Sequence, residues 1–201
     1  MYTPLSAKHQ YPKRIRTHRP ICRTTKTRNF IIKRTTVKLY ALDYRQSHTY
    51  LTASIFVAGN IVLPQLFHLL PQGGITWLPI YFFTLVAAYK YGWQVGLLTA
   101  LCSPLVNSLL FGMPHPAALP AITLKSVLLA TAAGYAAHHF QRISLLILAA
   151  VVLAYQSVGT LGEWLIIGNF SQAIQDFRIG LPGMCLQIFG GYYFLRQLLP
   201  K

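Results

Sequence analysis

Long apolar runs, separated by short polar segments or by segments rich in Gly and Pro, fill the chain from about residue 50 onward. An α-helix of about 20 mostly apolar residues, with its rise of 1.5 Å per residue, crosses the hydrocarbon core of a membrane. Six runs reach or approach this length: 50–70, 76–89, 93–111, 119–138, 144–167 and 171–199. The pattern predicts an all-α integral membrane protein with six transmembrane helices over residues 49–201.

The charges between the predicted helices indicate their orientation. If the N-terminal part lies inside, the inner connections carry Lys90 and Arg142, and the C-terminal end carries Arg196 and Lys201. The outer connections contain neither Lys nor Arg, and they are 71–75, 112–118 and 168–170. This is the positive-inside pattern. We therefore expect both termini to be cytoplasmic and the chain to be a multi-pass protein of the plasma (inner) membrane.

Residues 1–48 form a separate, strongly basic segment. The chain has 18 Lys and Arg against 3 Asp and Glu, and twelve of the 18 precede residue 50. No apolar period runs through this segment, so we expect a disordered cytoplasmic tail. The alternative is that translation begins near Val37. Nucleic-acid binding is not expected, because no aromatic platform or known binding module accompanies the charge.

Composition narrows the class further. Hydrophobic residues make up 54% of the chain and charged residues only 10%, against about 25% charged in soluble domains. This balance excludes a soluble domain and a disordered protein. The 3 Cys are isolated and have no metal-binding spacing, so we interpret them as packing residues.

Three ionisable residues inside the apolar runs carry the main functional signal: Lys125, Glu163 and Arg178. Counted from the outer ends of the predicted helices, they lie about 9, 7 and 10 Å deep. A charge in the bilayer costs about 2.5–3.5 kcal/mol on translocon scales, so such residues are rare and functional. Their common depth predicts a polar pocket, open outward, between the last three predicted helices. The alternative is an ion pair of Glu163 with Lys125 or Arg178 that only locks helix packing.

Three more residues are candidates for the same pocket. Gln156 precedes Glu163 by seven residues and therefore shares its helix face. Asn107 lies toward the outer end of its helix and can reach the pocket, or it can form an interhelical hydrogen bond instead. Trp164 can stack on a heterocyclic solute.

The chain lacks the sequence signatures of an enzyme. It contains no GxxxxGK[ST], HExxH or GxSxG motif and no plausible pair of catalytic carboxylates. We therefore expect no catalytic residue, no metal and no cofactor. Without a nucleotide site, uphill transport would take its energy from a partner or from an ion gradient.

Several features together resemble a known transporter family. Residues 60–112 contain the end of a first helix, an outer loop with Pro and Gly, and three segments: WLPI at 77–80, KYGWQVG at 90–96 and LCSPLVN at 101–107. With its six spans and its length, the region 37–199 resembles the substrate-binding S component of energy-coupling factor (ECF) transporters.

The resemblance implies a protein that captures a vitamin or similar micronutrient outside the membrane. Its partners would be a transmembrane coupling protein and a pair of cytoplasmic ATPases. In the family, the solute lies near the outer face, between the later helices and under the first outer loop, where Lys125, Glu163 and Arg178 are expected. Family members carry an Ala-xxx-Ala motif on the first helix for docking the coupling protein, and Ser54 and Ala58 stand at the matching positions.

Two other functions stay open on the sequence alone. One is a non-transport membrane scaffold, like the morphogenesis proteins whose six-span body resembles this fold. The other is an ion-coupled carrier or channel, which needs inverted repeats or a continuous polar path. The first three predicted helices offer few polar residues for such a path, and a scaffold has no reason to place three charges at one depth.

Overall fold

The computed structural model describes residues 44–198, apart from the side chain of Asp176. Most of the predicted tail 1–48 therefore lies outside the described residues. The described part is helical and contains no strand. Four of its helices are long and apolar enough to cross a membrane: α1 (Ser47–His68), α4 (Trp93–Phe111), α5 (Leu119–Phe140) and α6 (Leu145–Ile167). They confirm the all-α class and indicate a membrane protein.

The predicted run 76–89 differs from a single helix. A short helix α2 (Gly73–Trp77) ends at Leu78, a 3-10 turn η1 (Pro79–Tyr81) follows, and α3 (Phe82–Tyr91) continues from it. Leu78 adopts a left-handed conformation with φ 45° and ψ 46°, which breaks the helix. The proline that follows disfavours the right-handed helical conformation at residue 78.

The predicted run 171–199 is also divided. Two short helices, α7 (Phe170–Ala173) and α8 (Gln175–Ile179), come first. An unbroken helical stretch then runs through α9 (Leu181–Cys185), a π-helical turn η2 (Leu186–Gly190) and α10 (Gly191–Gln197). Pro182 stands in the first turn of α9, where a missing N–H costs no hydrogen bond. The long helical stretch therefore begins about ten residues later than the sequence predicts.

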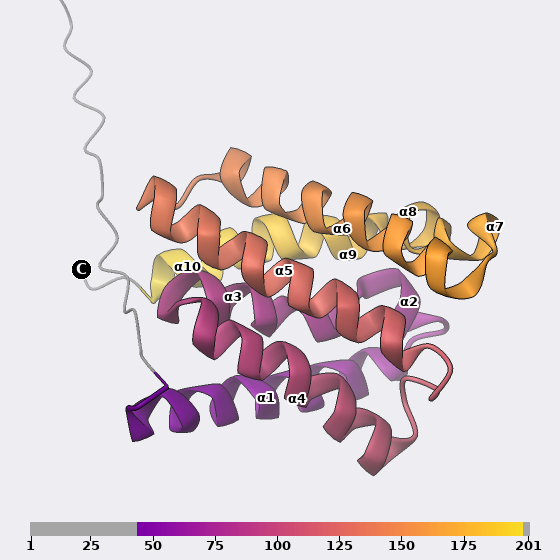
Figure 1. The fold of residues 1–201 in the computed structure, drawn as a ribbon, viewed down its shortest axis with the longest axis horizontal. Helices are drawn as coiled ribbons and strands as arrows, with labels where there is room; N and C mark the ends of the chain where they lie inside the picture. Colours follow the sequence, from indigo (N-terminus) through magenta and orange to yellow (C-terminus); the bar gives the residue numbers. More distant parts are fainter. Residues whose placement is uncertain (1–43, 199–201) are drawn as a thin grey trace, which may run out of the picture. The chain divides into compact units, whose positions relative to one another are not determined.

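The helices alternate in direction along the long axis of Figure 1. The chain runs from left to right in α1, α4 and α6, and back in α3, α5 and the α9–α10 stretch. Helix α3 packs against α1, α4, α5 and α10. Every residue from Thr84 to Lys90 is buried, so α3 is the central element and the other helices surround it.

Glycines let neighbouring helices approach α3 and α4 closely. A side chain at Gly96 on α4 would collide with Ala88 on α3, and a Cβ at Gly134 on α5 would lie 2.6 Å from Cβ of Trp93. At the other side of the bundle, the Tyr155 hydroxyl of α6 donates to Oε1 of Gln187 in η2 at 2.8 Å. These contacts fix the positions of the helices that carry the site described below.

Candidate functional site: a cavity at the α2 and α7 end

A cavity of about 700 Å³ lies at the end of the helices where α2 and α7 are found, on the right in Figure 1. Its walls come from the end of α1, from α2 and η1, from the α4–α5 connection and from side chains of α4 to α8. Volumes of about 300–1,000 Å³ are typical of small-molecule sites. The lining is largely apolar and includes Leu78, Ile80, Tyr81, Met113 and Ile122. Side chains with amide, imidazole and carboxylate groups complete the lining.

One wall rests on a buried hydrogen-bond network centred on Asn60 of α1. Its Nδ2 donates to Oγ1 of Thr84 at 3.0 Å and to Oγ of Ser103 at 3.1 Å. Its Oδ1 accepts from the backbone N–H of Phe83 at 3.2 Å, in the first turn of α3. A donor in the first turn of a helix has no partner within that helix. Asn60 therefore ties α1 to both α3 and α4 and supplies the missing acceptor.

Asn107 of α4 joins this network and reaches the cavity. Its Nδ2 donates to the backbone carbonyl of Asn60 at 2.9 Å and to that of Ser103 at 3.1 Å. In a regular helix the Asn60 carbonyl would accept from residue 64, but Pro64 has no N–H. The proline in α1 thus leaves an acceptor that Asn107 satisfies. Asn107 is 1% exposed, lines the cavity, and its Oδ1 has no hydrogen-bond partner among the described residues.

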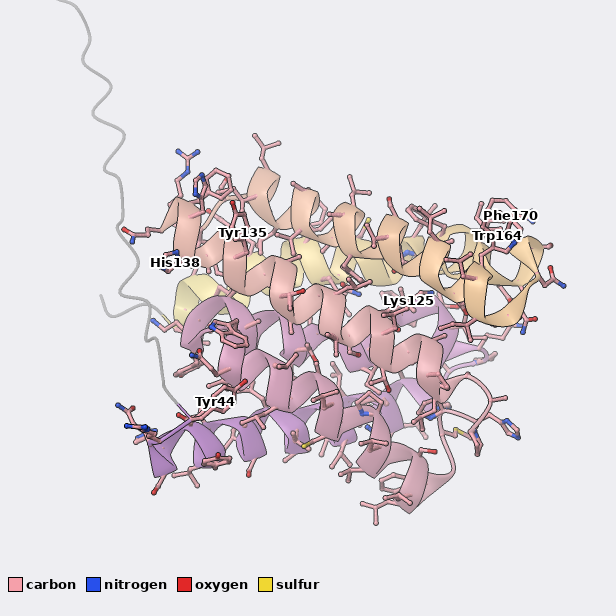
Figure 2. The ribbon with its side chains drawn as sticks, in the orientation of Figure 1. Tyr44, Lys125, Tyr135, His138, Trp164 and Phe170 are labelled. Carbon is pink, nitrogen blue, oxygen red and sulfur yellow. The ribbon has the colours of Figure 1, made fainter. Side chains whose placement is uncertain are left out.

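Lys125 of α5 and Glu163 of α6 form an ion pair, with Nζ of Lys125 2.5 Å from Oε2 of Glu163. Figure 2 shows Lys125 between α5 and α6, in the half of the bundle nearer to α2 and α7. Glu163 lines the cavity, and its side chain is 14% exposed against 1% for Lys125. The two charges neutralise each other, and the carboxylate is the member of the pair that reaches the cavity.

Gly159 creates the space for this pair. A Cβ at Gly159 would lie 2.6 Å from Cγ of Lys125 and 3.5 Å from both Cδ and Cε. The aliphatic part of Lys125 therefore lies directly across Gly159. One turn further along α6, Glu163 receives the ammonium group, because residues i and i+4 share a helix face.

Of the six predicted binding residues, Asn107 and Glu163 line the cavity, and Lys125 pairs with Glu163 without lining it. Arg178 is exposed in α8 and is not among the residues that line the cavity. Gln156 is fully buried, does not line the cavity, and neither atom of its side-chain amide has a partner among the described residues. Trp164 is 42% exposed and stacks edge-on against Phe170, with ring centroids 5.7 Å apart (Figure 2).

The predicted docking positions lie on the outside of α1. Ser54 and Ala58 are both exposed, and the Ser54 hydroxyl donates to the backbone carbonyl of Tyr50 at 2.9 Å. A hydroxyl bound to its own helix in this way presents little polarity to its surroundings. This face of α1 is therefore smooth and apolar, flanked by exposed Leu51, Ile55 and Val62.

The predicted set of binding residues omits several residues that line the cavity. His68, Gln72, His115, Gln172 and Gln175 all line the cavity. They sit in helix ends and connections, where no periodicity marks them. Pro79 was the available sequence signal for these residues. The helix breaks before this proline, and the break places α2 over the end of the bundle. Residues 44–198 contain no group of three or more His, Cys, Asp or Glu that could hold a metal ion.

Comparison with models of protein families, with curated proteins and with solved structures finds no match to this chain. The function is therefore inferred from the sequence pattern and from the cavity.

Proposed function

We propose that this chain is the substrate-capture subunit of an ECF-type ABC importer in the plasma (inner) membrane. It crosses the membrane six times with both termini in the cytoplasm, and it binds a vitamin or similar micronutrient in the cavity at the α2 and α7 end, which faces outward. A transmembrane coupling protein and a pair of ATPases complete the importer.

The six-span topology rests on direction and charge. Beside the four long helices, η1 with α3 and the α9–α10 stretch run along the same axis (Figure 1). At 1.5 Å per residue, residues 79–91 extend about 20 Å and residues 181–197 about 26 Å. Both are shorter than the roughly 30 Å hydrocarbon core. Because α3 is surrounded by protein, its ends need no lipid-matched length.

One observation carries the capture role: Asn107 lines a cavity of about 700 Å³ together with Glu163, and its buried acceptor Oδ1 has no hydrogen-bond partner within residues 44–198. A buried polar atom without a partner costs free energy, about 1–3 kcal/mol. Such an atom in a cavity wall is explained if a solute supplies the hydrogen bond. A scaffold protein gains nothing from it.

The partner assignment comes from the resemblance and from the missing energy source. The chain has no nucleotide-binding motif, so the ATPase pair provides the energy. The exposed face of α1 around Ser54 and Ala58 is suited to close contact with a helix of the coupling protein, because small residues allow helix backbones to approach.

A variant in which a larger side chain fills the cavity tests the proposal. Ala118 lines the cavity, while its neighbour Ala117 is exposed and does not. We expect native mass spectrometry of the purified protein to detect a bound small molecule, which Ala118→Trp removes and the control Ala117→Trp retains. A protein that carries no small molecule and binds none from a cell extract, yet is folded, would favour the scaffold function instead.

A further inference from the structure

Resting on the proposed function, the geometry points to the charge class of the solute: we propose that the cavity takes an uncharged or cationic compound. This compound presents hydrogen-bond donors from an apolar body, and compounds with a net negative charge are rejected. The inference narrows the sequence expectation of a pocket with one carboxylate and two cations, which would also suit an anion.

The first fixed group belongs to Asn107, which lines the cavity, and it is an acceptor whose orientation cannot reverse. Asn107 uses both donor hydrogens of Nδ2, on the carbonyls of Asn60 and Ser103. A flip of the amide would break both bonds and place Oδ1 against two other acceptors. Oδ1, with no partner among the described residues, is therefore held as an acceptor, and it can bind only a donor.

The second fixed group is a carboxylate. Glu163 lines the cavity, whereas Lys125, its ion-pair partner, does not. Lys125 is 1% exposed and lies across Gly159. Its charge is therefore neutralised by Glu163 within the packed helices. A solute that enters meets carboxylate oxygen before it meets the ammonium.

The remaining polar lining does not reverse this balance. Among the lining residues that the structure describes, none is Lys or Arg. Gln65, Gln72, Gln172 and Gln175 carry amides, and His68 and His115 carry imidazoles. Both kinds of group can donate as well as accept and so adapt to the solute. An anion brought against the two fixed acceptors would lose its water and gain no matching donor there, which is unfavourable.

The apolar lining defines the rest of the solute. Leu78, Ile80, Tyr81 and Ile122 line the cavity along with four prolines, Pro64, Pro71, Pro79 and Pro114. Such a lining suits a flat ring or a short aliphatic body. A solute with a ring and an amide, amine or alcohol group satisfies both the apolar lining and the fixed acceptors.

Competitive equilibrium dialysis tests the charge class. The purified protein is dialysed at pH 7 against equal concentrations of thiamine and 1-methylnicotinamide (cationic), nicotinamide, pyridoxine and riboflavin (uncharged), and nicotinate, pantothenate and biotin (anionic), together with a deproteinised cell extract. Retained compounds are identified by mass spectrometry, and their charge is read from electrophoretic mobility. The double variant Lys125→Met/Glu163→Gln, which leaves no buried charge unpaired, is dialysed in parallel.

We expect every compound retained by the wild type to be uncharged or cationic. The double variant should bind a cationic compound about 10- to 100-fold more weakly, because a charged hydrogen bond is lost, and an uncharged compound with a smaller change. Retention of an anionic compound that Ala118→Trp removes would overturn the charge assignment and leave the capture function intact. Retention of nothing from the mixture and extract would overturn the capture function and this inference with it.

Discussion

The side-chain amide of Asn107 donates a 2.9 Å hydrogen bond to the backbone carbonyl of Asn60, an acceptor that Pro64 leaves unused one turn later in α1. This contact joins α1 to α4 and leaves the remaining oxygen of Asn107, a residue that lines the cavity, without a hydrogen-bond partner among the described residues. One proline in one helix thus sets the orientation of a polar group in another.

Replacing Asn107 should therefore have two separable effects. We expect Asn107→Leu to lower the free energy of unfolding by about 1–2 kcal/mol, since the Asn60 carbonyl loses its donor. In a Pro64→Ala background the N–H of residue 64 can supply that bond, and the stability loss caused by Asn107→Leu should shrink. Thermal unfolding of the four proteins in detergent measures this cycle.

Solute binding by the same four proteins separates structure from recognition. The affinity for the co-purifying solute should fall about 10-fold with Asn107→Leu in both backgrounds, because Oδ1 is lost in each. Equal stability losses in the two backgrounds would contradict the role given to Pro64. Unchanged affinity would contradict the role given to Oδ1.

Gly159 tests the packing of the ion pair. A Cβ at this position would lie 2.6 Å from Cγ of Lys125, in the middle of a side chain that is held at both ends. We expect Gly159→Ala to displace Lys125 from Glu163 and to lower stability by about 1–3 kcal/mol. The matched control is Gly162→Ala on the same helix, whose Cβ would meet the tip of the Leu124 side chain, also at 2.6 Å.

The tip of a leucine can rotate away, so the control should be close to neutral in thermal unfolding. Both variants replace glycine by alanine within α6, and the helix propensity gained is the same. If the two variants unfold at the same temperature, Lys125 is not fixed across Gly159.

Substitutions of Lys125 and Glu163 should have strongly non-additive effects on the free energy of unfolding. Lys125→Met leaves the Glu163 carboxylate without its ion-pair partner, and Glu163→Gln does the same to the Lys125 ammonium. Each single variant should lose about 3–5 kcal/mol of stability, while the double variant should recover most of that loss. Denaturant unfolding in detergent gives the three values, and additive losses would mean that the two charges act independently.

The exposed face of α1 should matter for transport and not for binding. Ala58→Leu enlarges a side chain on the face proposed to dock the coupling protein. We expect it to abolish co-purification of the coupling protein and ATPases and to stop solute uptake, with the affinity of the isolated subunit unchanged. The control is Ala154→Leu, the same change at an exposed position of α6, which should keep full uptake.

Loss of solute affinity in Ala58→Leu would place this face in the binding site instead. Full uptake with normal co-purification would remove α1 from the docking surface. Only the second result leaves the cavity proposal standing, because neither Ser54 nor Ala58 lines the cavity.

The long helices could be predicted from the sequence, because an apolar run of about 20 residues has few other solutions in a membrane. The run 93–111 coincides with α4 as observed. The broken elements were harder. Hydropathy averages over a window, so it passes over a single residue such as Leu78 in a left-handed conformation. It also passes over the three-residue turn that follows.

The same averaging explains why Arg178 was predicted to lie deep within a long helix. Its predicted depth assumed a continuous helix over 171–199, whereas the chain forms α7 and α8 first and the long stretch begins at Leu181. Lys125 and Glu163 lie within unbroken helices, and their predicted proximity is observed. The sequence left a solute pocket or a packing pair open for Glu163, and in the structure Glu163 lines the cavity and is paired with Lys125.

The network around Asn60 could not be read from the sequence. Polar residues in apolar runs suggest interhelical hydrogen bonds, but which residues meet depends on how α1, α3 and α4 cross. The unused carbonyl of Asn60 follows from Pro64 by local geometry alone. Its partner, 47 positions away along the chain, does not.

An experimental structure of the protein with its co-purifying solute would test the central claim most directly. We predict density for the solute in the cavity, with a donor group within hydrogen-bond distance of Oδ1 of Asn107 and with the Lys125–Glu163 pair intact beside it. Solute density anywhere outside this cavity, or an Asn107 amide turned so that Nδ2 faces the solute, would contradict the account.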